Sequence, residues 1–164
     1  FYHYTQDWLQ MMDNKLHITP YTKEHGQFIL SCQMNHKILE ADSKYIKVMG
    51  DASNLQEDNL SFTAILNNKP IVSAGMKMVW GKVAEGWVIG TSEMLKHPIA
   101  ISKVIKRDFA RIAKEQDIER IQTAVRKDFK TGIRFVEWLG FEREGLMKKW
   151  GFDGTDQYMY ARII

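Results

Sequence analysis

A short stretch from His97 to Ser102 joins an apolar strand, predicted over residues 87–93, to the longest amphipathic helix signal in the chain. A strand that runs into a helix points the first free backbone N–H groups of the helix at the end of the sheet. Such an end is a natural site for a phosphate or a carboxylate. A protonated His97 would add positive charge to it. The sequence therefore predicts a candidate anion site at this bend.

Other kinds of catalytic site find no support in the sequence. The five histidines show no metal-ligand spacing with cysteine or carboxylate residues, and we predict no metal site. There is no nucleophile elbow of the Gly-x-Ser-x-Gly type and no phosphate loop ending in Gly-Lys-Ser or Gly-Lys-Thr. Cys32 is the only cysteine, so no internal disulfide can form, and we expect it to be a small buried apolar group.

The composition is that of an ordinary globular protein. The chain has 164 residues, of which 45% are hydrophobic and 26% are charged. No apolar run approaches the length of about 20 residues that a membrane span needs, and we expect no membrane association. The excess of acidic residues in 1–60 and of basic residues in 61–164 fits either phosphate contacts or a solvated basic face. No nucleic-acid-binding motif accompanies that charge, so nucleic acid is not indicated as a partner.

The elements that position the bend follow from hydrophobic periodicity and turn signals. We predict a helical appendage over residues 1–14, followed by a single domain over residues 15–164. Its elements alternate hairpins with a strand-helix-strand crossover, which predicts a three-layer α/β domain with a mixed, mostly antiparallel sheet and helices on both faces. Strands are predicted at 15–20, 61–66, 71–80, 87–93, 118–125, 141–150 and 157–164, and helices at 23–39, from the bend to about 116, and at 131–139. Turns are predicted at 67–70, at 81–86, which contains Glu85 and Gly86, and at 151–154 around Asp153-Gly154.

The stretch from Ile133 to Glu142, which contains Leu139-Gly140-Phe141, resembles the fourth-helix motif of the GNAT (Gcn5-related N-acetyltransferase) superfamily. The downstream Glu144-Gly145 and the closing run Asp153 to Tyr158, with Tyr160 and Arg162, resemble the last GNAT hairpin. The resemblance covers about residues 15–164 and implies the acyl-CoA N-acyltransferase fold. It also implies that the bend at 97–102 is where acetyl-CoA, or another acyl-CoA, would place its pyrophosphate.

The chain departs from the GNAT pattern at three places. The family motif at the bend is Gln/Arg-x-x-Gly-x-Gly/Ala, whose glycines allow the backbone to approach a phosphate closely; here neither glycine is present and Pro98 restricts the backbone. Phe129 stands where many members have a cofactor-contacting asparagine. Val136 stands where they have a tyrosine that protonates the departing thiolate. The resemblance thus implies a degenerate acetyl-CoA loop and weak or absent catalysis.

A second resemblance is to GNAT-like morphogenesis proteins of tailed phages, which are internal-virion or scaffold-like. It rests on the pattern Trp87-x-x-x-Thr91-Ser92-Glu93, on the basic helix after the bend and on Ile133-Arg134-Phe135. It implies a role in virion assembly with a virion or other protein partner. The chain carries no secretory signal in its first residues, so we expect it in the cytoplasm, that of a bacterial host for a phage protein, or in the virion.

Two functions stay open at this point. In the first, the protein is an active acetyl-CoA-dependent N-acyltransferase acting on a small amine or a protein amino group, with Glu85 or Glu93 as the base that deprotonates the amine. In the second, the scaffold is kept for binding only. Four tryptophans, Trp80, Trp87, Trp138 and Trp150, are expected to pack in the core or in hairpins, and an exposed pair would indicate an interface. The residues expected to hold the cofactor, if it binds, are Ser92, Glu93, His97, Ile99, Ala100, Ile101, Ser102 and Lys103.

Overall fold

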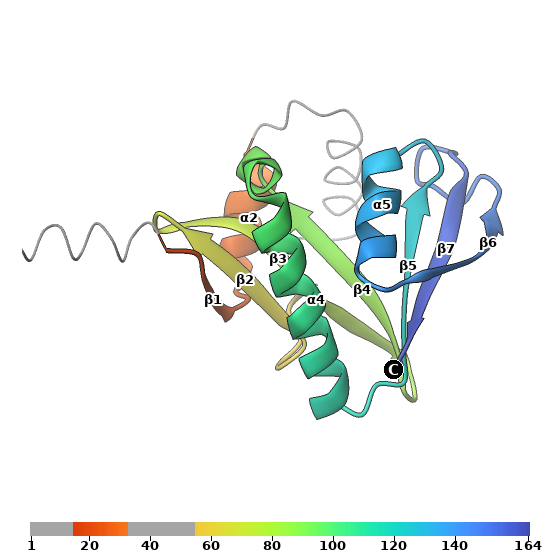
Figure 1. The fold of residues 1–164 in the computed structure, drawn as a ribbon, viewed down its shortest axis with the longest axis horizontal. Helices are drawn as coiled ribbons and strands as arrows, with labels where there is room; N and C mark the ends of the chain where they lie inside the picture. The colour runs from red at the N-terminus through yellow and green to blue at the C-terminus, as the bar shows by residue number, and fades with distance from the viewer. Residues whose placement is uncertain (1–14, 33–54) are drawn as a thin grey trace, which may run out of the picture.

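The structure, a computed structural model, describes residues 15–32 and 55–164 (Figure 1). The predicted appendage over 1–14 lies outside the described residues. In chain order the elements are β1 (His17–Pro20), α2 (Lys23–Ser31), β2 (Ser61–Leu66), β3 (Lys69–Trp80), β4 (Val83–Gly90), the 3₁₀ helix η2 (Ser92–Lys96), α4 (Pro98–Glu115), β5 (Arg120–Arg126), α5 (Lys130–Trp138), β6 (Glu142–Met147) and β7 (Gln157–Ile163).

One seven-stranded sheet holds all these strands, in the order β1-β2-β3-β4-β5-β7-β6. Every neighbouring pair is antiparallel except β4 and β5, which are parallel and are connected through η2 and α4. The predicted turn between β2 and β3 is formed by Asn67 and Asn68, whose φ angles of 52° and 59° suit a primed hairpin turn. The mixed, mostly antiparallel sheet predicted from the sequence is confirmed.

The helices cover both faces of the sheet, as the alternation of β4 side chains shows. Gly86 faces Phe109 of α4. Trp87 and Ile89, which point to the opposite face of the strand, pack with Ile29 of α2. Figure 1 accordingly places α4 and α5 in front of the sheet and α2 behind it. The main core lies on the α4 and α5 side, where the ring of Phe109 meets that of Phe62 edge-on at 6.3 Å between centroids.

The strand before the bend differs from the prediction. Only Gly81 and Lys82 form the turn, with a φ of 50° at Gly81, so β4 begins at Val83 instead of residue 87 and ends at Gly90 instead of residue 93. The predicted turn residue Gly86 lies within the strand, where its lack of a side chain leaves room for the Phe109 ring. Glu85 is therefore a strand residue, and the turn predicted around it was wrong.

The bend itself also differs from the prediction. Residues 92–96 form η2, and α4 already begins at Pro98, so the residues predicted as a bend are the first helical turn. Proline is favoured at the first helical position because its φ suits the helix and its missing N–H would be unpaired there. The predicted strand end at Glu93 is thus a 3₁₀ helix.

Three predictions, about the length of one helix and the burial of Cys32 and of the tryptophans, were wrong as well. Helix α2 ends at Ser31, because Cys32 has an extended backbone, and the remainder of the helix predicted to residue 39 lies outside the described residues. Cys32 is half-buried instead of buried. Trp80, Trp138 and Trp150 are 71%, 45% and 65% exposed, so these three are surface residues and not core. Each belongs to an element end or hairpin loop, where the pattern of neighbours carries little information about burial.

Candidate functional site

The two parallel strands at the centre of the sheet, β4 and β5, separate part of the way along their length. Their pairing covers Val83–Arg120, Ala84–Ile121 and Glu85–Gln122 only, whereas β4 continues to Gly90 and β5 to Arg126. Figure 1 shows the two strands meeting near the C-terminus and diverging above it. We call the gap beyond Glu85 and Gln122 the wedge. Within it, each strand is hydrogen-bonded to its outer neighbour, β4 to β3 and β5 to β7.

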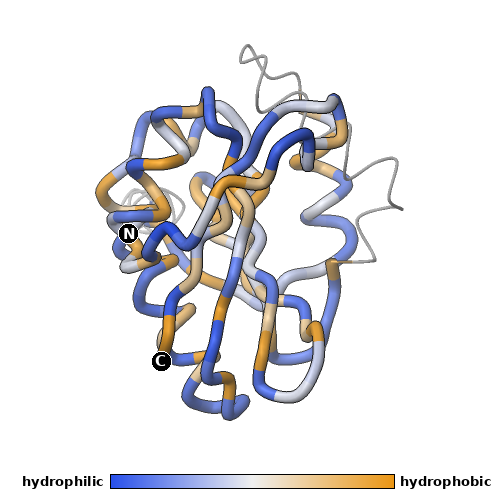
Figure 2. Tube along the Cα trace, turned by 90° about the vertical axis from the view of Figure 1, so that its right-hand side faces the viewer, coloured by the Kyte–Doolittle hydropathy of each residue, from blue (hydrophilic) through white to orange (hydrophobic). Residues whose placement is uncertain are grey.

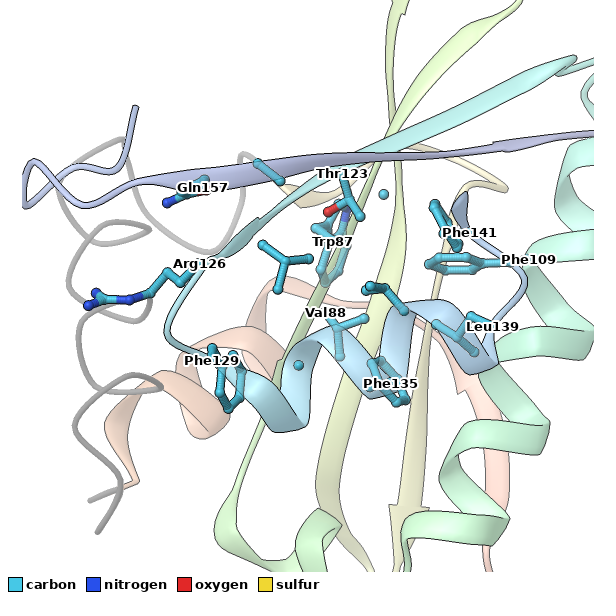
Figure 3. A pocket seen from close by; sticks show the side chains of 15 residues that line it. Trp87, Val88, Phe109, Thr123, Arg126, Phe129, Phe135, Leu139, Phe141 and Gln157 are labelled. Atoms are coloured by element: carbon cyan, nitrogen blue, oxygen red, sulfur yellow. The ribbon is translucent and has the colours of Figure 1, made fainter. Parts of the chain in front are cut away.

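A cavity of about 150 Å³ occupies the wedge. Phe135 and Val136 of helix α5 and Leu139 at its C-terminal end line the cavity on one face, and Figure 3 shows Phe135 and Leu139 on this helix beside the strands. Most of the lining is therefore apolar. The full lining consists of Gly86, Trp87, Val88, Phe109, Thr123, Ala124, Val125, Arg126, Phe129, Gly132, Phe135, Val136, Leu139, Phe141 and Gln157.

Helix α5 is held over the wedge by a polar contact with the last hairpin. The fully buried Tyr160 of β7 donates its hydroxyl hydrogen to Glu137 at 2.9 Å and accepts a hydrogen bond from Arg143 of β6 at 3.0 Å. Burial raises the pKa of the Tyr160 hydroxyl, which keeps it protonated as a donor to Glu137. Val136 is the neighbour of Glu137 in α5. The hydrogen bond between Tyr160 and Glu137 therefore also holds Val136, on the apolar side of the helix, toward the strands.

At the open end of the wedge, Arg126 ties β5 to the loop between β6 and β7. Its guanidinium lies 3.1 Å from a carboxylate oxygen of Asp128 and 2.7 Å from one of Asp153. The hydrogen bond from Arg126 lowers the pKa of Asp128, and hydrogen bonds from Thr155 and then Arg126 lower that of Asp153. Both carboxylates are thus ionised at neutral pH, and the charge of Arg126 is balanced within the protein.

The first turn of α4 offers two backbone donors without an acceptor in the helix. The N–H of His97 donates to the carbonyl of Met94 at 3.2 Å, and the N–H of Ile101 donates to the carbonyl of His97 at 3.0 Å. Pro98 has no backbone N–H. The groups left over by the geometry of a helix start are those of Ile99 and Ala100. No side chain caps this end and no acidic residue lies in its first turn. An anion would be stabilised here by two donors and the helix dipole.

The two candidate bases lie in different environments. Glu85 is exposed on β4 at the apex of the wedge, opposite Gln122 in the last paired position. Glu93 lies in η2 and forms an ion pair with Lys96 at 2.7 Å. The hydrogen bond from Lys96 lowers the pKa of the Glu93 carboxyl, which makes it a weaker base. The geometry favours Glu85 of the two.

The predicted cofactor residues cluster at the start of α4 and are absent from the cavity lining. Ser102 turns its hydroxyl back to the carbonyl of Pro98, Ile101 is buried in the core, and Ile99 is exposed. Lys103 and Ser92 are exposed near this helix end. Phe129 and Val136, the two positions at which the chain departs from the GNAT pattern after the bend, do line the cavity.

The residues of β4 and β5 that form the walls of the wedge were not predicted from the sequence. Gly86, Val88 and Thr123 have no chemical signature, and only the point at which two strands stop pairing makes them a site. The predicted strand-helix-strand crossover makes β4 and β5 parallel, and ligands bind at the carboxyl ends of such strands, but this pattern does not mark where the two strands stop pairing.

Within residues 15–32 and 55–164, no three His, Cys, Asp or Glu side chains come together in a way that could hold a metal ion. In the same part of the chain, no helix is long and apolar enough to cross a membrane.

Comparison with solved structures gives close agreement in fold at low sequence identity. A GNAT-family acetyltransferase from Bacillus anthracis is 21% identical, with a TM-score of 0.67 over 90% of this chain and 94% of that one. One from Streptococcus pneumoniae is 14% identical, with a TM-score of 0.69 over 92% and 99%. A ribosomal-protein-alanine N-acetyltransferase from Brucella melitensis is 16% identical, with a TM-score of 0.65 over 91% and 100%.

Neither a protein-family model nor a curated protein sequence matches the chain. The structural likeness nevertheless covers almost the whole length of both chains in each comparison. The chain therefore has the GNAT acyl-CoA N-acyltransferase fold, as its sequence motifs predicted.

Proposed function

Because the chain has the GNAT fold, we propose that it binds an acyl-CoA in the wedge between β4 and β5 and transfers the acyl group slowly to an amine. The observation that carries this proposal is the separation of the two strands beyond Glu85 and Gln122, with an apolar cavity in the gap. Each missing ladder bond between the two strands leaves backbone N–H and C=O groups without a partner in the sheet, and an inserted ligand would pair with them.

The wedge suits a narrow chain that carries both amide groups and methylene groups. The facing edges of β4 and β5 present backbone N–H and C=O groups of the kind that pair with an added strand. The side chains of Phe135 and Val136 supply apolar contact for methylene groups. A pantetheine arm has both features. The N–H groups of Ile99 and Ala100 at the start of α4 would hold its phosphates, with Lys103 close by in sequence.

The chemistry that the acyl-CoA supplies is an activated thioester, whose carbon–sulfur bond breaks as the amine nitrogen bonds to the carbonyl carbon. The protein's part would be to accept the proton that the amine loses, a role that we assign to the exposed carboxylate of Glu85 at the apex, directly or through water. Val136, which lines the cavity, has no proton to give to the departing thiolate. We therefore expect catalysis to be weak, with acetyl-CoA or another acyl-CoA as donor and a small amine or a protein amino group as acceptor, in the cytoplasm.

Isothermal titration calorimetry with acetyl-CoA tests the proposal. We expect micromolar binding by the unaltered protein, and no detectable heat at millimolar ligand would refute it. Val88→Phe adds bulk inside the cavity and is expected to weaken binding at least tenfold. Val83→Phe adds the same bulk to the same strand on the paired side of the apex and serves as the control. Equal binding by both variants would place the ligand elsewhere.

A binding role without catalysis, including the virion-assembly role, is the second candidate. It is favoured by the exposed aromatic side chains of Trp80, Trp150 and Phe152, which are 71%, 65% and 61% exposed. Large exposed aromatics are typical of interaction surfaces. The same titration separates the two candidates, because a folded protein that gives no heat with acetyl-CoA favours the binding role.

A further inference from the structure

Trp87 is the one aromatic residue that β4 places in the cavity lining. It lies two residues beyond Glu85, where the pairing with β5 ends, and therefore at the narrow end of the wedge. Its ring meets that of Tyr21 edge-on at 5.3 Å between centroids, and it packs against the cluster formed by Ile29, Leu30 and Ile89. These contacts fix the orientation of the indole before any ligand binds.

The indole nitrogen of Trp87 has an unmet hydrogen-bonding requirement. Its Nε1 atom is buried and, among the residues that the structure describes, has no hydrogen-bond partner. Buried donors are nearly always paired, because an unpaired one loses its hydration without compensation. Indole N–H is a donor only, so the missing partner must be an acceptor. Figure 3 shows Trp87 amid the cavity lining, with Thr123 of β5 next to it in this view.

We propose that the indole N–H of Trp87 donates a hydrogen bond to the carbonyl oxygen of the acyl thioester, and so makes the site recognise acylated CoA in preference to free CoA. This inference rests on the proposed function. The leading end of an arm inserted into the wedge is its acyl end, and the narrow end of the wedge is where Trp87 lies. The carbonyl oxygen is the acceptor at that end, whereas a free thiol carries no such oxygen.

The position of Glu85 agrees with this assignment. Glu85 and Trp87 are two residues apart on one strand, so their side chains project from the same face of the sheet, about 6.6 Å apart along the strand. A carbonyl carbon held between them would have a proton acceptor on one side and a donor to its oxygen on the other. A donor that is already oriented and shielded from water also stabilises negative charge that develops on that oxygen.

The test compares acetyl-CoA with free CoA on the same protein by calorimetry. Trp87→Phe keeps an aromatic ring against Tyr21 but removes the N–H, and we expect it to weaken acetyl-CoA binding about threefold to tenfold while leaving CoA binding unchanged. Trp80→Phe makes the same substitution at a residue that is 71% exposed on β3 and should change neither affinity. Loss of affinity for both ligands in Trp87→Phe, or for neither, would overturn the inference.

A second measurement is made on the unaltered protein, so it does not depend on whether a variant folds or is active. In a ¹H–¹⁵N spectrum the five tryptophans give five indole signals, and the one absent from Trp87→Phe, or left after assignment of the other four, belongs to Trp87. We expect this signal to move downfield when acetyl-CoA is added and much less when CoA is added. A signal that stays in place while acetyl-CoA binds refutes the role of Trp87 alone. Absence of binding by either ligand refutes the proposed function and, with it, this inference.

Discussion

Replacing Val136 by tyrosine tests the idea that this site lacks a proton donor. Val136 is 8% exposed and lines the wedge, on the helix that Tyr160 and Glu137 anchor over the strands. A general acid in the right place contributes about 10²–10⁴ in rate. A thiol has a pKa of about 8.5, so a departing thiolate needs less help than an alkoxide or an amine. We therefore expect an increase in kcat of about tenfold to a hundredfold for Val136→Tyr.

The matched control is Val136→Phe, which adds the same ring without the hydroxyl. Extra bulk in a packed core costs about 1–3 kcal/mol of stability, and the adjacent cavity of about 150 Å³ should keep both variants near the low end. The assay follows thiol release from acetyl-CoA with a panel of primary amines and peptide N-termini, beside a calorimetric affinity for each variant. If Val136→Tyr is no faster than Val136→Phe although both bind acetyl-CoA, a missing proton donor does not limit this site.

Three further predictions concern the base, the core and the helix cap. Glu85→Gln should lower kcat about 100-fold or more with little change in acetyl-CoA affinity, whereas Glu93→Gln should change neither; equal losses in both would refute the choice of Glu85. Ile105→Ala, at a fully buried position of α4, should lower the free energy of unfolding by about 2–5 kcal/mol in urea titrations. Burial lowers the pKa of His25, whose neutral ring accepts the N–H of Thr22, so its contribution to stability is complete above pH 6.5 and is lost as the pH falls through the lowered pKa. The Tm of His25→Gln should lack that pH-dependent loss, and parallel Tm profiles would contradict this.

The last third of the domain followed the sequence closely because its signals are local. Leu139-Gly140-Phe141 ends α5 as predicted, and Gly140 adopts a φ of 91°. The turn at Asp153-Gly154, with a φ of 78° at Gly154, closes the last hairpin. Asn67 and Asn68 form the β2–β3 turn by the same logic. In each case a residue type fits a backbone conformation that few others adopt, so neighbours in the sequence suffice for the prediction.

The start of α4 was predicted as an anion site, and that stays a prediction, but the predicted boundaries of this segment were wrong. The residues from Pro98 onward are helical because Pro98 suits the first helical position and Ile101 packs into the core. The same pattern of residues is compatible with a bend or with a helical turn, and the packing of Ile101 under the sheet decides between them. Likewise, Gly86 resembles a turn residue until Phe109, 23 positions later, is seen to pack against it.

The sequence by itself determined the types and order of most elements and the turns, because each depends on residue type or short-range periodicity. Only the tertiary structure decided where the site is. The wedge exists because β4 and β5 pair through Glu85 and Gln122 and then diverge, and residues 37 positions apart must be placed side by side for that to appear. The unpaired indole nitrogen of Trp87 is a property of its surroundings in the fold. No pattern of neighbouring residues encodes either feature.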